Sequence, residues 1–174
     1  MNQIKQYILF FLLFLPLATI AQTQDENVTS VSIRASATVV GNRGSIELET
    51  ISDIGLLRAS QLQDGDEVVI NPVFDPEAGI MRASGQPNAE IRVSYLTEME
   101  VARREGPGLI FFEYQVSGYP GDNQRESELL DLLEREVRFN EDGIYYFWIG
   151  GTIDLSEALP GNYDGEFTIE IEYM

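Results

Sequence analysis

Residues 137–149 read VRFNEDGIYYFWI, an apolar stretch, a turn and a second, strongly apolar stretch. Asn140 and Gly143 at the ends of the turn tolerate the backbone angles that tight hairpins require. Aromatic and β-branched residues on both sides favour strands over a helix. The segment therefore predicts a β-hairpin whose second strand, IYYFWI at 144–149, is buried.

Apolar and polar residues alternate in several other segments bounded by turn-forming residues, and each such segment predicts a strand. The segments are residues 31–39, 46–48, 68–70, 91–95, 109–117 and 167–173. LIFFEYQVS at 109–117 begins as a continuous apolar run, which predicts a central strand covered on both faces. Strands at this spacing predict an all-β protein with an immunoglobulin-like or pilin-like antiparallel β-sandwich.

One segment departs from the strand pattern. ESELLDLLERE at 126–136 has four leucines at helix-like spacing among good helix formers. We expect one short helical turn here. An irregular crossover, with leucines anchored in the core, is the alternative.

The first 21 residues have the layout of a secretory signal peptide. Lys5 precedes the apolar run YILFFLLFLPLATI at 7–20, and Ala21 ends a small-residue cleavage site. A membrane anchor is the alternative, but the run is shorter than the ~20 residues that span a bilayer. We expect residues 1–21 to be removed, 22–30 to form a polar arm and 31–174 to form the sandwich. The mature protein is then periplasmic, secreted or on a bacterial cell surface, with no membrane insertion.

The composition excludes much chemistry. The chain has 29 Asp+Glu, 11 Lys+Arg, no His and no Cys, and its only lysine lies in the signal segment. The mature chain thus carries 10 − 29 = −19 charges. Thiol catalysis, disulfides, Cys- or His-ligated metals and the Ser–His–Asp arrangement are unavailable. A chain this acidic is a poor nucleic-acid partner. We expect no enzyme, no cofactor, and no catalytic or metal-binding residues.

Four acidic segments raise the question of calcium, which binds six to eight oxygen ligands. They are Asp64-Gly65-Asp66, Asp75-Pro76-Glu77, Asn140-Glu141-Asp142-Gly143 and Asn162-Tyr163-Asp164-Gly165. These residue types are also the ones that tight turns favour. None has the spacing of the helix–loop–helix calcium site, so we interpret all four as turns.

Two further groups have a structural and a functional interpretation. The aromatic run 145–148 is a candidate platform for sugars, but a strand places at most two of the four side chains on one face, and burial in the core is favoured. Gly150-Gly151 after this run predicts a bulge or close backbone packing. Arg103-Arg104 is a candidate anion site, but flanking Glu100 and Glu105 favour a salt-bridged loop.

Four stretches together resemble a known family of secreted bacterial proteins. They are ASATVV at 35–40, NPVFDPEAGIMRASGQPNAEIRVSY at 71–95, FNEDGIYYFWIGGTIDL at 139–155 and PGNYDGEFTIEIEYM at 160–174. On these residues the chain resembles the domain-of-unknown-function family 4402 (DUF4402). The ending is also similar to that of fimbrial subunits. This resemblance implies an immunoglobulin-like sandwich and supplies no catalytic residues.

In many fimbrial subunits an N-terminal strand is lent to a neighbouring subunit, so the resemblance makes residues 28–40 a candidate for strand exchange and self-association. The same residues can equally be the first strand of their own sandwich. Tyr163 is a candidate corner tyrosine, whose hydroxyl bonds nearby backbone.

We therefore expect a structural, fimbria-like surface subunit. The alternative is a module that binds a glycan or another extracellular ligand, which predicts an exposed aromatic near Tyr119 or Tyr145 beside a groove. A hydrolase would need two close carboxyl groups, one with a raised pKa.

Overall fold

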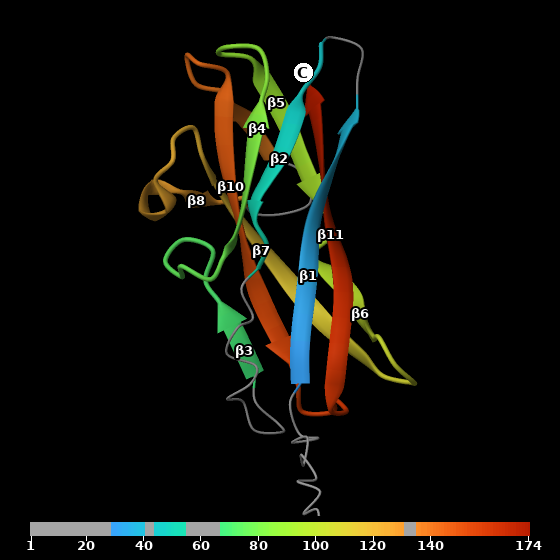
Figure 1. Ribbon diagram of the computed structural model, residues 1–174. Coiled ribbons are helices and arrows are strands. Elements are labelled where there is room, and N and C mark those ends of the chain that lie inside the picture. Colours follow the sequence, from blue (N-terminus) through green and yellow to red (C-terminus); the bar gives the residue numbers. More distant parts are fainter. Residues whose placement is uncertain (1–28, 41–43, 55–66, 131–134) are drawn as a thin grey trace, which may run out of the picture.

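The computed structural model describes residues 29–40, 44–54, 67–130 and 135–174 (Figure 1). The signal segment, the arm as far as residue 28, and Asp64-Gly65-Asp66 lie outside the described residues. The strands are β1 (Thr29–Val40), β2 (Glu47–Ser52), β3 (Glu67–Ile70), β4 (Gly79–Ser84), β5 (Glu90–Tyr95), β6 (Glu98–Arg103), β7 (Leu109–Tyr119), β8 (Glu128–Leu129), β9 (Arg135–Arg138), β10 (Ile144–Asp154) and β11 (Gly161–Tyr173). A 3-10 turn, η2, spans Gln124–Glu126.

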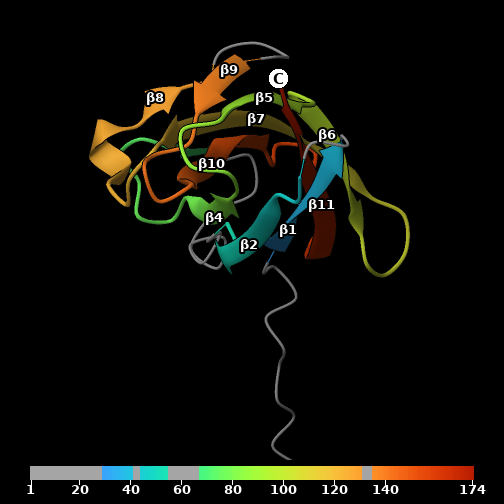
Figure 2. The same cartoon turned by 90° about the horizontal axis from the view of Figure 1, so that it is seen from above.

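The strands form one hydrogen-bonded sheet in the order β2-β4-β10-β7-β6-β11-β5-β9. β3 pairs with β10, β8 pairs with β7, and β1 pairs with β11. Apart from the parallel β1–β11 pair, the strand pairs of the described residues are antiparallel. Seen from above, the strands curve around a common interior and the sheet stays open (Figure 2). The predicted all-β sandwich is confirmed.

The tight turn predicted after Phe139 forms, but the predicted hairpin is wrong. β9 leads through this turn into β10 but pairs with β5, because both edges of β10 are taken by β7 on one side and by β3 and β4 on the other. The second strand is buried as predicted, on both faces over residues 147–151. Trp148 is only 1% exposed. Tyr145 lies beside Phe147, and Tyr146 stacks on Trp148 with ring centroids 6.0 Å apart. The aromatic run therefore belongs to the core, as predicted, with two rings on each face of the strand.

The prediction that residues 109–117 are covered on both faces is wrong. β7 is central in strand order, between β10 and β6, but its first half alternates between exposed and buried residues. Phe111 is 48% exposed, whereas Phe112 is fully buried. The apolar run at the start of β7 arises because one side of the strand faces the core and the outer side also carries apolar residues. In β10, by contrast, residues 147–151 are buried on both faces.

The short helical turn expected over residues 126–136 is also wrong for the described part of that segment. Glu128–Leu129 is a strand that pairs with β7, and Arg135–Arg138 is a strand that pairs with β5. Leu130 is buried in the core. Pairing with existing sheet edges and burial of this leucine outweigh the local helix propensity.

Gly150 and Gly151 permit two close backbone contacts in β10. A Cβ atom on Gly150 would lie 2.2 Å from the carbonyl oxygen of Ile70. One on Gly151, where φ is +146°, would lie 2.0 Å from the carbonyl oxygen of Glu113. The predicted close packing is confirmed, and it lets β3 and β7 approach β10 from opposite sides.

Candidate interaction surfaces

The first candidate surface is the edge that β1 covers. β1 runs parallel to β11 in unbroken register, from Thr29 opposite Gly161 to Val40 opposite Glu172. The two strands lie side by side along their length (Figure 1). In the described part of the chain, β11 is the only strand to which β1 is hydrogen-bonded. The segment proposed for strand exchange thus occupies the edge of its own domain.

Tyr163 anchors the beginning of the strand that receives β1. Its side chain is 1% exposed, and its hydroxyl donates a hydrogen bond of 2.8 Å to the carbonyl oxygen of Leu159. The predicted corner tyrosine is confirmed, although it lies within β11 and not before it. The bond fixes the loop that leads into β11 against the core.

The arginine pair has partners far away in sequence. The Arg104 guanidinium binds both carboxylate oxygens of Asp164, with Nε–Oδ2 and Nη2–Oδ1 distances of 2.5 and 2.9 Å. The Nη2 atom of Arg103 donates to the carbonyl oxygen of Pro160 at 2.5 Å. The hydrogen bond from Arg104 lowers the pKa of Asp164, and the same pair raises that of Arg104. The expectation of a salt bridge local to the Arg103-Arg104 loop is wrong, because the carboxylate comes from β11.

Two of the acidic segments are turns, as predicted. The Asn140 side-chain oxygen accepts hydrogen bonds from the backbone N–H groups of Asp142 and Ile144, at 3.0 and 2.7 Å. The Asp75 carboxylate accepts one from the N–H of Glu77 at 3.1 Å. The turn interpretation is wrong for residues 162–165, which lie in β11. No group of three or more acidic side chains within the described ranges has the geometry of a metal site.

The second candidate surface is a groove of about 630 Å³ between β5, β6 and β11. The groove opens where β5 and β6, which both pair with β11, separate from each other. β6 pairs with β11 at Tyr163 and Asp164, and β5 pairs with it from Ile169 onward. Between these two pairings, residues 165–168 of β11 have β1 in register on one side and, among the described residues, no paired strand on the side of the groove.

The floor of the groove is apolar and comes from the sandwich interior. Tyr114 and Phe167, whose ring centroids are 4.4 Å apart, form it together with Tyr95 and Met99. The Tyr114 hydroxyl donates to the Met99 sulfur at 3.0 Å, and the Tyr95 hydroxyl donates to the carbonyl oxygen of Leu130 at 2.8 Å. Burial raises the pKa of Tyr114, so its hydroxyl remains a neutral donor.

The rim of the groove is acidic. It carries the exposed side chains of Glu98, Glu100, Glu166 and Glu170. Among the described residues that line the groove, none is an arginine. The rim therefore has a negative field above an apolar floor.

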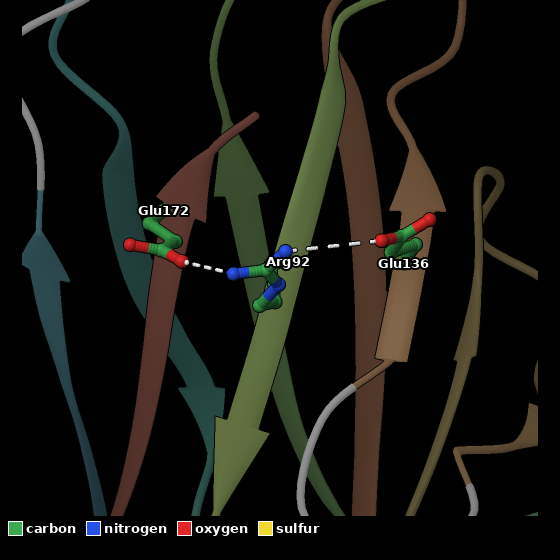
Figure 3. Close-up of polar contacts among 3 residues, drawn as sticks. All are labelled: Arg92, Glu136 and Glu172. Carbon is green, nitrogen blue, oxygen red and sulfur yellow. Dashed lines mark hydrogen bonds and ion pairs between the residues drawn. The ribbon is translucent and has the colours of Figure 1, made fainter.

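Arg92, on a strand that borders the groove, and Arg104, just after the end of another, form ion pairs with acids outside the groove. Arg92 of β5 lies between Glu172 of β11 and Glu136 of β9 and spans three strands (Figure 3). Its Nη1 atom is 3.0 Å from Glu172 Oε1, and its Nη2 atom is 3.9 Å from Glu136 Oε1. Arg104 is held by Asp164. These ion pairs connect neighbouring strands of the sheet. Among the described residues, none of the four rim glutamates forms an ion pair.

The exposed aromatic expected for glycan binding is not at Tyr145, which is buried. Tyr119 is half-buried, with its hydroxyl near Glu126. In the part of the chain that the structure describes, the exposed aromatics are instead Phe74 and Phe111. The groove residues were not singled out from sequence, because the alternation of Met99 with its glutamate neighbours is typical of any half-buried strand.

Two carboxylates have displaced pKa values. That of Asp154 is lowered by hydrogen bonds with Ser156, and that of Asp164 by Arg104. Both shifts favour the ionised form, whereas a glycosidase acid needs a raised pKa.

None of the helices in the described part of the chain is long and apolar enough for a membrane crossing.

No protein-family model matches the chain, and no curated protein matches it in sequence.

Proposed function

We propose that this chain is a non-enzymatic, secreted β-sandwich that acts as a structural, fimbria-like subunit of a bacterial cell surface. The observation that carries the proposal is the β1–β11 pairing. A single terminal strand closes one edge of the domain through a twelve-residue parallel register. A strand paired along one edge of a domain through main-chain hydrogen bonds is an element that neighbouring subunits can exchange.

The chemistry of the chain supports a structural role. With no His, no Cys and a single lysine in the signal segment, the mature protein has carboxylate, hydroxyl and guanidinium groups alone for catalysis. Its buried tyrosines serve the core, where Tyr163 bonds backbone and Tyr114 bonds a thioether. The similarity of the chain ending to that of fimbrial subunits points in the same direction.

Removal of β1 tests this proposal. Residues 22–174 and residues 41–174 are compared by light scattering after size exclusion, and Trp148 fluorescence reports on the core. We expect the longer chain to form dimers or ladders, and the shorter chain to stay folded, monomeric and able to bind a synthetic peptide of residues 29–40. An unbound edge of β11 attracts such a strand because its backbone groups lack partners.

The contrary result is a longer chain that stays monomeric at all concentrations and a shorter chain that unfolds and is not rescued by the peptide. β1 would then be an integral strand, and strand exchange would be abandoned.

A ligand-binding module is the second candidate, and the groove between β5, β6 and β11 favours it. Grooves with an apolar floor and a few charged groups are typical of ligand sites. Of the two aromatic positions that a glycan-binding version would use, Tyr145 is buried and Tyr119 is half-buried, which favours a ligand other than a glycan.

A further inference from the structure

The groove between β5, β6 and β11 reaches down to the core, where Tyr114 and Phe167 are buried beneath the half-buried Met99. The register of β11 with β6 ends at Asp164, and that with β5 starts at Ile169. Leu96, in the link between β5 and β6, lines the groove and is 74% exposed. An isolated domain gains nothing from an exposed leucine beside an open apolar floor, whereas an interaction surface does.

The charges around the groove repel one another. Glu98 lies directly opposite Glu113 in the β6–β7 register, and like charges in such positions destabilise a sheet. Arg34 of β1 lies opposite Glu166, so that end of the rim has a cation in register. Glu98, Glu100 and Glu170 have no such cation among their described register partners, which are Glu113, Phe111, Ser94 and Thr38.

We propose that this groove binds a cationic, partly apolar peptide segment of another protein. An apolar side chain of that segment packs on Leu96 and Met99, while flanking arginines or lysines meet the rim glutamates. Charge complementarity selects the partner, because the rim repels anions. It also disfavours a second copy of this chain, whose mature form carries 10 − 29 = −19 charges. The groove is built from β5, β6, β7 and β11, so the proposal does not depend on exchange of β1.

The test uses residues 22–174 and two fluorescein-labelled heptapeptides, RLRYRLR and its acidic counterpart ELEYELE. Fluorescence anisotropy measures binding, and amide chemical shifts locate it. Three variants of the protein are compared. Glu98→Gln with Glu100→Gln removes two rim charges, Leu96→Lys places a cation at the apolar side of the groove, and Glu47→Gln with Glu141→Gln is the control for equal loss of charge elsewhere.

We expect the basic peptide to bind, the acidic one not to bind, and binding to weaken as salt increases. The rim double variant should bind about three- to tenfold more weakly, since an exposed ion pair contributes up to ~1 kcal/mol. Leu96→Lys should weaken binding similarly, and the control should match the wild type. Amide shifts should cluster at Tyr95, Met99 and Phe167.

Absence of binding by the basic peptide would overturn the proposal. Equal weakening by the control pair would do so too, because it would indicate diffuse attraction to an acidic protein. If the protein instead dimerises without peptide and Leu96→Lys abolishes the dimer, the groove belongs to a second copy. Far-UV circular dichroism shows that each variant is folded, and the exposed positions of the changes make unfolding unexpected.

Discussion

The hydroxyl of Tyr163 reaches back four residues to donate its hydrogen bond to the carbonyl oxygen of Leu159. Removal of this donor leaves a buried acceptor without its partner. We expect Tyr163→Phe to lower the free energy of unfolding by about 1 to 2 kcal/mol. Urea titration followed by Trp148 fluorescence measures the change. Tyr146→Phe, the same deletion on a half-buried ring, should have a smaller effect, and an equal effect would contradict this account.

Gly151 should tolerate alanine much less well than Gly106. Both have positive φ, +146° and +80°, which costs a non-glycine residue about 1 to 2 kcal/mol. At Gly106 the nearest atom to an added Cβ, on Arg103, is 3.7 Å away, whereas at Gly151 it is the Glu113 carbonyl oxygen at 2.0 Å. We expect Gly151→Ala to cost about 3 kcal/mol or more, because crowding adds to the strain. Equal melting temperatures of the two variants would refute the close β7–β10 contact.

The ion pair between Arg104 and Asp164 should make stability depend on acid pH. Because the folded-state pKa of Asp164 is lowered, the pair contributes fully above the unfolded pKa of about 3.9 and is lost as pH falls through the folded value. Asp164→Asn should therefore be less stable than the wild type at pH 7, and the difference should shrink towards pH 3. Urea midpoints at the two pH values measure this. A difference that grows on acidification would exclude the assignment.

The buried hydroxyl of Tyr145 should make the free energy of unfolding fall as pH rises in the alkaline range. Burial raises the pKa of Tyr145 to about 12, so the folded state keeps its proton when the unfolded state has begun to lose it. The stability that this pKa difference contributes is complete below the unfolded-state pKa of about 10, and it is lost as pH rises through the folded-state pKa of about 12. Tyr145→Phe should lose less stability over this interval, as measured by urea titration. A steeper loss in the variant would contradict the burial of this hydroxyl.

Large apolar side chains made most of the strands predictable. In β10 and β11 aromatic and β-branched residues mark the buried positions, so the pattern is visible in one sequence. β4 was missed because its buried positions hold Gly79, Met81 and Ala83, two of which are too small for a clear hydrophobic alternation. In the described part of 126–136 the expected helix is replaced by a strand, because leucine spacing reports local propensity, whereas sheet pairing of Glu128–Leu129 decides the conformation there.

The candidate surfaces depend on relations between distant residues. Tyr163 was identified because its hydrogen bond is local, four residues along the chain. The groove forms only when Tyr114, Phe167 and Met99 meet, and their meeting depends on where β5 and β6 separate along β11. The Arg104–Asp164 pair joins residues that are 60 positions apart. A strand pattern specifies which face is buried, but not where two strands diverge.

The β1–β11 register also has a mechanical consequence. Because the strands are parallel, the N-terminal end of β1 and the C-terminal end of β11 lie at opposite ends of the ladder (Figure 1). Tension applied between these two ends acts along the strand axes. It loads the hydrogen bonds from Thr29 to Val40 in shear, so many must break together and none can be peeled off singly. A domain tethered through its two ends would therefore resist stretching far more than the free energy of any single bond implies.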